Sequence, residues 1–149
     1  MPSCEELDLA EASFDLAYSS LVFHYVVNLR GLFATIRRAL LPGGQLVFSI
    51  EHPIFMAPRR PGWIVDSEGR MSWPVDGYLV EGPRTTKWLV EGVVKQHRTM
   101  GTTLDALIDA GFTIAHVEEW GPTDEQIAEL PELAEERERP PYLLVAARN

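Results

Sequence analysis

Two histidines follow strand-like segments, and they are the first candidates for catalytic side chains. His24 comes shortly after the segment Phe14–Ser19, and His52 follows an apolar run that ends in Glu51. An ordinary histidine has a pKa near neutrality, so His52 could serve as general base for a hydroxyl or amine acceptor. Each has a structural alternative: His24 as a packing residue in an apolar stretch, and His52 with Glu51 as caps of the next loop.

A second cluster of candidates lies in the stretch RTTKWLVEGVVKQHRT. Lys95 and His97 are two residues apart, so in a strand they share one face, and Trp88 precedes them. Such a cluster could hold an anionic or aromatic substrate. The alternative is a solvated strand face on which the tryptophan anchors the segment to the core.

The composition narrows the class of protein. A chain of 149 residues, 46% of them hydrophobic, has room for one domain with a real core. Its net charge of −9 disfavours a nucleic-acid partner. Cys4 is the only cysteine and the four histidines are scattered, so neither an intramolecular disulfide nor a metal cluster is expected. The N-terminus lacks the pattern of a signal peptide, and no apolar run approaches the ~20 residues that span a bilayer, which predicts a cytoplasmic protein without a membrane partner.

The elements that must position these side chains begin with a βαβ unit. Phe14–Ser19 has the composition of a strand, and apolar residues at helical spacing follow Asn28, a good helix N-cap. We expect the Pro42–Gly44 turn to end this helix, because proline cannot continue it. Gln45–Ile50 is then a continuous apolar run, as in a strand buried on both faces. The crossover between the two strands should be right-handed.

A second unit lies near the C-terminus. Thr102 is the expected N-cap of a helix that ends at Gly111, before a strand at Phe112–Val117. Tyr142–Ala147 is a further apolar strand, which we expect to run antiparallel to the others because no helical crossover precedes it. Residues 54–100 lie between the two units as an insertion, the lid, with a β-hairpin that turns at Glu91–Gly92.

This order of motifs resembles the class I S-adenosylmethionine-dependent methyltransferases, in their small-molecule "type 11" branch. SFDLAYSSLVFHYV is similar to the strand and helix start at the methionine end of the cofactor, and LRGLFATIRRALLPGGQLVFSIEHP to the next helix, turn and strand. TLDALIDAGF and PYLLVAA resemble the last helix and the antiparallel seventh strand. The resemblance implies an α/β, partial Rossmann-like sheet of about four strands, methyl transfer to a small molecule and S-adenosylmethionine as cofactor.

The resemblance also implies roles for individual residues. The backbone of Ser19, Ser20 and Leu21 would contact the methionine part of the cofactor, and His24 would lie near its sulfonium. In SCEEL, Ser3 stands where the family has an aspartate, while Glu5 keeps a second acid that contacts adenine. HRT resembles the lid signature of this branch, which adds His97 and Arg98 to Trp88 and Lys95 as substrate-binding candidates.

One departure from the family pattern shapes the functional expectation. The family's glycine-rich cofactor loop and the acid that holds the ribose belong to a first half that precedes these motifs, and the chain has no G-x-G sequence. We therefore expect the C-terminal part of the fold, as one domain over residues 1–149, active if the first half completes it. The alternative is a non-catalytic remnant that does not bind cofactor alone. In either case Phe14–Ser19 becomes an edge strand, which we expect a second copy of the chain, a swapped segment or the N-terminal residues to cover.

Overall fold

The chain folds around one four-stranded sheet. The computed structural model describes residues 7–88 and 90–149, and the side chains of residues 87–91 lie outside this description. The strand order is β1-β2-β8-β7, with β1 at Phe14–Ser20, β2 at Leu40–Glu51, β8 at Tyr142–Arg148 and β7 at Thr113–Trp120. β1 is parallel to β2, and β8 is antiparallel to both β2 and β7. The predicted α/β class, the antiparallel last strand and the edge position of β1 are thus confirmed.

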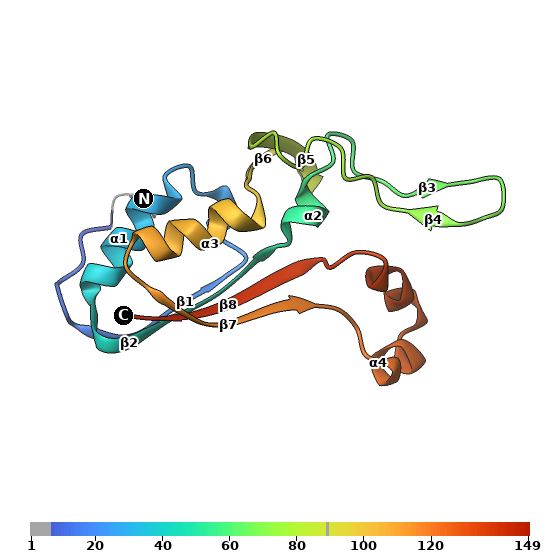
Figure 1. Ribbon diagram of the computed structural model, residues 1–149. Coiled ribbons are helices and arrows are strands. Elements are labelled where there is room, and N and C mark those ends of the chain that lie inside the picture. The colour runs from blue at the N-terminus through green and yellow to red at the C-terminus, as the bar shows by residue number, and fades with distance from the viewer. Residues whose placement is uncertain (1–6, 89) are drawn as a thin grey trace.

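Two helices cover one face of this sheet. Figure 1 shows α1 (Leu29–Ala39) and α3 (Met100–Asp109) side by side along it. The Asn28 side chain caps α1 by accepting a hydrogen bond from the Gly31 amide at 3.0 Å. The spacing of apolar residues in α1 turns one stripe of side chains toward the sheet. The core between helices and sheet contains Leu32, Phe33, Leu46, Phe48, Leu107 and Leu143.

The Pro42–Gly44 turn lies inside β2 and not at the end of α1, so this boundary was predicted wrongly. α1 ends at Ala39 and β2 begins at Leu40. Phe14 of β1 pairs with Leu40, whereas Leu16 pairs with Gln45, so the residues between bulge out of the ladder. Gly43, with φ +79°, supplies the left-handed backbone of this bulge.

The start of α3 was also predicted too late. Thr99, not Thr102, is the N-cap, since its side chain accepts a hydrogen bond from the Thr102 amide at 3.1 Å. Both residues are threonines, which are good N-caps. The tertiary structure selects the earlier one, because the Glu81 carboxylate also accepts a hydrogen bond from the Thr99 amide. The predicted end of the helix is correct, because Gly111 follows α3 in a left-handed conformation with φ +91°.

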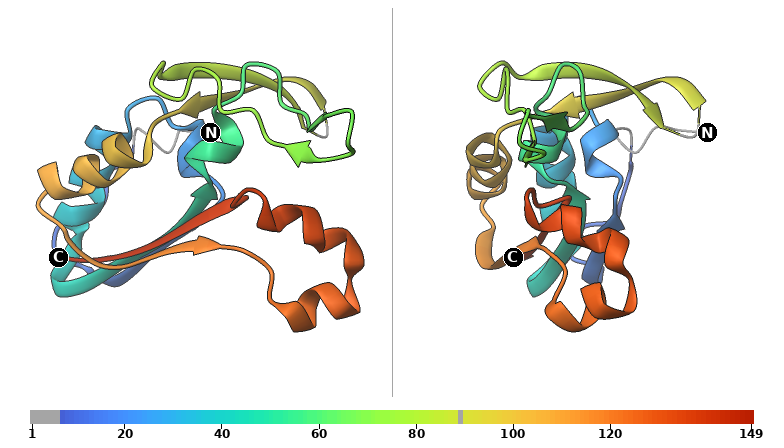
Figure 2. Two further views of the ribbon diagram at one scale, coloured as in Figure 1. Left: turned by 45° about the vertical axis from the view of Figure 1, so that its right-hand side comes forward. Right: turned by 90° about the vertical axis from the view of Figure 1, so that its right-hand side faces the viewer.

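The lid lies at the end of the sheet where β1 and β2 finish (Figure 2). A helical turn, α2 (Pro53–Met56), leads into it, followed by strand pairs β3 (Ile64–Val65) with β4 (Met71–Ser72) and β5 (Gly82–Trp88) with β6 (Val90–His97). The predicted hairpin is β5–β6, but Trp88 pairs with Val90, so the chain reverses before the expected Glu91–Gly92 turn. The short α2 and the β3–β4 pair were not predicted.

A second excursion at the same end connects β7 to β8. It contains α4 (Asp124–Glu129) and the 3-10 helix η2 (Pro131–Arg137), drawn in orange and red in Figure 1. Thr123 and Gln126 form a capping box at the start of α4. Among the helices of the described residues, none has the length and apolar character needed to cross a membrane.

Candidate functional site

The carboxyl end of β1 carries the residues predicted to face a cofactor. Leu21 has a left-handed backbone with φ +54°, and its amide donates to the Ser49 carbonyl at 2.9 Å, which fixes the turn to β2. The Ser19 hydroxyl oxygen is buried and has no hydrogen-bond partner within the described part of the chain. Such an atom is unusual in a folded protein, because buried polar groups nearly always find a partner.

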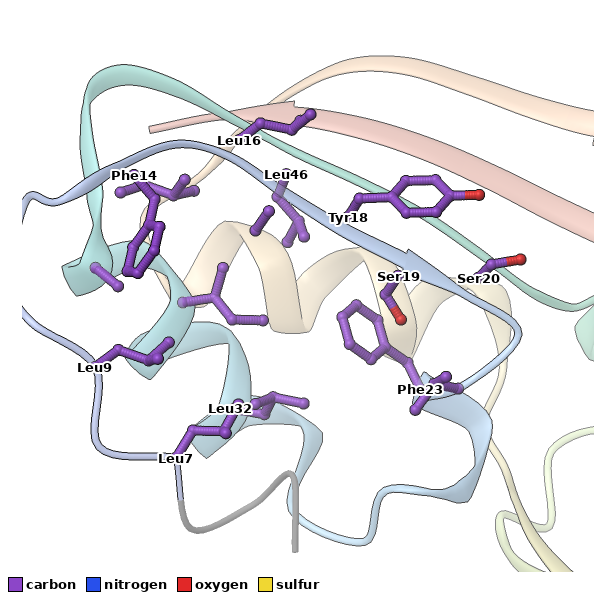
Figure 3. A pocket seen from close by; sticks show the side chains of 15 residues that line it. Leu7, Leu9, Phe14, Leu16, Tyr18, Ser19, Ser20, Phe23, Leu32 and Leu46 are labelled. Carbon is purple, nitrogen blue, oxygen red and sulfur yellow. The ribbon is translucent and has the colours of Figure 1, made fainter.

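An apolar groove of about 440 Å³ runs along β1 and ends at these serines (Figure 3). Its walls come from β1, from α1 and from the short 3-10 helix η1 (Phe23–Tyr25), and Leu7 and Leu9 lie at its rim. Ser19 and Ser20 line the groove, whereas Leu21 is not among its lining residues. Leu16 and Tyr18 are 56% and 71% exposed, so the apolar surface of the edge strand faces solvent.

His24 lies in η1 and is buried against the end of β2. The Glu51 amide donates to its Nδ1 at 3.2 Å, which places the proton of the neutral ring on Nε2. Burial, with a smaller contribution from the positive charge of Lys95, lowers the pKa of His24 to about 4. The imidazole is therefore neutral at neutral pH, and His24 joins η1 to β2 without adding charge to the site.

A buried ion pair lies next to His24. The Lys95 ammonium on β6 binds the Glu51 carboxylate at the end of β2, and the two residues are 2% and 7% exposed. The ammonium also lies 5.9 Å from the centre of the Tyr25 ring. Burial and then the negative charge of Glu51 raise the pKa of Tyr25. Glu51, Lys95 and His24 thus form one cluster that joins β2, the lid and η1, and Lys95 points inward and not into solvent.

Both ring nitrogens of His52 are hydrogen-bonded within the fold, so neither is free to act as a general base. Its Nδ1 accepts from the Ile54 amide at 3.1 Å, and its Nε2 lies 2.9 Å from the Glu119 carboxylate on β7. Burial lowers the pKa of His52, while Glu119 acts in the opposite direction. Both ring nitrogens are therefore engaged in holding α2 and β7 together, which favours the capping alternative.

His97 and Arg98 anchor the lid. His97 is fully buried, and its Nε2 lies 2.8 Å from the Tyr78 carbonyl; burial lowers the pKa of His97. Arg98 donates to the carbonyls of Val26 and Val27 beyond η1. Trp88 belongs to β5, but its side chain lies outside the described residues, as does Glu5. Among the described candidates, Lys95 lines the cavity under the lid, whereas Arg98 lines smaller pockets beside η1 and α1.

That cavity, of about 320 Å³, lies between the lid and the end of β2. Its polar residues are Glu51, Arg84, Thr86 and Lys95, and its apolar walls are Phe55, Met56, Pro58 and Pro61. Sequence reasoning missed Arg84 and Thr86. The same-face argument that paired Lys95 with His97 could have found them, because they are also two residues apart and Arg84 pairs with Lys95 across the hairpin.

A second unpredicted feature ties the lid to the C-terminal excursion. The guanidinium of Arg139, 6% exposed, lies 4.4, 5.1 and 4.1 Å from the ring centres of Phe55, Trp63 and Trp73. It donates to the Glu136 carboxylate at 3.2 Å, and burial raises the pKa of Glu136. Such cation–π contacts are strongest where water is excluded. Within the residues that the structure describes, no group of acids, histidines or cysteine is arranged to hold a metal ion.

Comparisons with known proteins point to one family. A family model described as a methyltransferase domain matches residues 2–48. The crystal structure of an S-adenosylmethionine-dependent methyltransferase from Mesorhizobium loti is 62% identical in sequence, with a TM-score of 0.95 over 99% of this chain and 68% of its own. A candidate S-adenosylmethionine-dependent methyltransferase from Listeria monocytogenes is 35% identical, with a TM-score of 0.89 over 99% of this chain and 67% of its own. An uncharacterised Haemophilus influenzae protein is 33% identical over 148 residues, and the match spans 95% of this chain but 56% of that relative.

Proposed function

Because the chain belongs to the S-adenosylmethionine-dependent methyltransferases, we propose that it forms the acceptor-binding part of a domain that methylates a small molecule. The observation that carries this proposal is the buried cluster of His24, Glu51 and Lys95 beneath the lid. The cluster lies at the carboxyl ends of β1 and β2, where open α/β sheets bind their ligands. A lid over that edge suits a reaction that must position two molecules and exclude water.

The end of β1 offers one wall for the cofactor. S-adenosylmethionine, the cofactor of the family, supplies a methyl group on a positively charged sulfur. The unpartnered hydroxyl of Ser19 suits a polar atom of its methionine part, and the backbone turn at Ser20 and Leu21 lies beside it. None of the described residues that line the groove is charged, so the described part of this wall offers no charged partner for the ammonium and carboxylate of that part.

The residues under the lid fit a positioning role. Methyl transfer to oxygen or nitrogen is a direct displacement that depends mainly on alignment of the two reactants. Glu51 presents a carboxylate, held by Lys95, that can accept a hydrogen bond from an acceptor hydroxyl or amine. His24 stays neutral and supports the Glu51 backbone. A catalytic role for His24 or His52 requires that the bound cofactor or acceptor rearrange the present hydrogen bonds of these rings.

A non-catalytic alternative is favoured by the exposed edge of the sheet. Among the described strands, only β2 pairs with β1, and Leu16 and Tyr18 are exposed beside the apolar groove. Such an edge is a template for pairing with another chain. In this second proposal the chain does not bind cofactor by itself and associates with a second copy through β1.

Titration with S-adenosylhomocysteine separates the two proposals. We expect the 149-residue chain alone to bind it weakly, and a fusion with the part of the Mesorhizobium loti protein outside the match to bind it with a micromolar Kd. In the fusion, Ser19→Ala should weaken binding several-fold, whereas Ser13→Ala, an exposed serine before β1, should not. Micromolar binding to the chain alone would exclude the non-catalytic alternative. Failure of the folded fusion to bind would overturn the methyltransferase proposal.

A further inference from the structure

The cavity under the lid has the features of a site for a negatively charged small molecule. We propose that it binds a small carboxylic acid in its ionised form, with the carboxylate held by Arg84 and Thr86 and the apolar body against Phe55 and Pro58. That this acid is the methyl acceptor rests on the proposed function. That the cavity binds such an acid rests on the cavity alone and can be tested without cofactor.

The local charge is opposite in sign to that of the whole chain. The net charge of the protein is −9, yet among the described residues that line the cavity Glu51 is the single acidic one, against two basic ones. Glu51 is already paired with Lys95. Two further arginines, at positions 59 and 60, lie between Pro58 and Pro61 of the wall. A basic pocket in an acidic protein concentrates anions, because low-dielectric walls focus its field.

Within the described residues, Arg84 is held by backbone carbonyls and forms no ion pair with a carboxylate. Its guanidinium donates to four backbone carbonyls, at 3.3 Å to Ala57, 3.4 Å to Pro83, 3.2 Å to Gly77 and 2.6 Å to Val80. These carbonyls fix the direction of the guanidinium while leaving its positive charge uncompensated. A planar donor of this kind suits a carboxylate better than a neutral group.

Thr86 supplies a second donor on the same strand. Its hydroxyl oxygen is buried and has no hydrogen-bond partner in the described part of the chain, although the residue lines the cavity. Arg84 and Thr86 are two residues apart in β5, so their side chains lie on one face of the hairpin. A carboxylate oxygen would satisfy the hydroxyl, and hydrogen bonds to charged groups are stronger than those between neutral groups.

The size and walls of the cavity limit the rest of the ligand. A volume of about 320 Å³ lies near the lower end of the range for small-molecule pockets. Proline, methionine and phenylalanine side chains form its apolar part. The size and the apolar walls therefore favour a compact acid with an aliphatic or aromatic body.

The proposal is tested with three fluorinated probes of similar size, and fluorine NMR measures the binding of each to the 149-residue chain. These are 4-fluorobenzoate, 4-fluorobenzamide and 4-fluorobenzylamine. We expect saturable binding of the acid, with a Kd at least tenfold below that of the amide, and no detectable binding of the amine. Thr86→Val, which keeps the shape but removes the hydroxyl, should weaken binding of the acid about fivefold. The matched control is Thr85→Val, because Thr85 is exposed on the other face of β5.

Replacing the buried pair of Glu51 and Lys95 provides a test that is independent of Thr86. Glu51→Gln/Lys95→Met removes both members of the buried pair together, and circular dichroism verifies that the variant is folded. We expect it to retain some preference for the acid, because Arg84 remains. Equal binding of acid and amide by the natural chain would overturn the proposal, as would tighter binding of the amine or no saturable binding of any probe. None of these outcomes depends on S-adenosylhomocysteine, so the two proposals fail separately.

Discussion

Replacing Lys95 by methionine tests the buried pair that holds the lid to the sheet. The variant leaves the Glu51 carboxylate, 7% exposed, without its ammonium partner. Removal of one member of a buried pair costs about 3–5 kcal/mol, a large share of the roughly 5–15 kcal/mol that stabilises a typical domain. With a urea m-value of about 2 kcal/mol/M, the unfolding midpoint should fall by about 2 M.

The double variant Glu51→Gln/Lys95→Met should recover part of the stability that Lys95→Met loses. It removes both charges together, so it should be at least about 2 kcal/mol more stable than Lys95→Met alone. Urea unfolding followed by circular dichroism measures both, and Val94→Ala, at an exposed neighbouring position, should change stability by less than about 1 kcal/mol. A cost below about 1 kcal/mol for Lys95→Met would refute the reasoning. So would a double variant as unstable as the sum of the single ones.

Four further measurements test other parts of the structure. Because the folded pKa of His24 is about 4, below the 6.5 of an ordinary histidine, its contribution is complete above pH 6.5 and falls by up to about 3 kcal/mol as the pH drops to 4; His24→Gln should flatten this slope in urea unfolding. Arg139→Met should open the aromatic contacts of the lid and shift tryptophan fluorescence to longer wavelength; an unchanged spectrum would contradict this. Gly111→Ala should destabilise the domain by more than about 1 kcal/mol, because φ is +91° and a Cβ would lie 2.9 Å from a side-chain nitrogen, while Gly101→Ala should not, since its Cβ would meet ordinary contacts. If β1 mediates self-association, Leu16→Lys should convert a dimer to a monomer in light scattering; a natural chain that is already monomeric would disprove the association.

The helix boundaries illustrate where local signals suffice. The apolar spacing of α1 and its Asn28 cap depend on neighbours within a few residues, so they could be predicted. The start of α3 could not, because Thr99 and Thr102 are equivalent by local criteria and the choice depends on Glu81, distant in sequence. The Pro42–Gly44 bulge likewise depends on the register with β1.

The candidate site divides in the same way. Histidine, lysine and arginine at the strand ends and in the lid were identifiable by residue type, and the order of motifs identified the family. Their roles depend on which groups meet: Lys95 faces Glu51, whereas His52, His97 and Arg98 bond to groups that hold the lid and the excursions in place. Arg139 was missed because nothing in its immediate sequence marks a buried polar group, whereas Arg84 and Thr86 share the two-residue spacing that singled out Lys95 and His97.

The sequence by itself determined the class of fold and the family. These follow from periodicity, from turn residues and from the order of motifs, all of which can be read along the chain. Only the tertiary structure decided that Lys95 is buried against Glu51 and that Arg84 and Thr86 share a cavity with them. The physical reason is that burial and electrostatic pairing depend on groups far apart in sequence: Glu51 and Lys95 are 44 residues apart, and the fold of the lid alone brings them into contact.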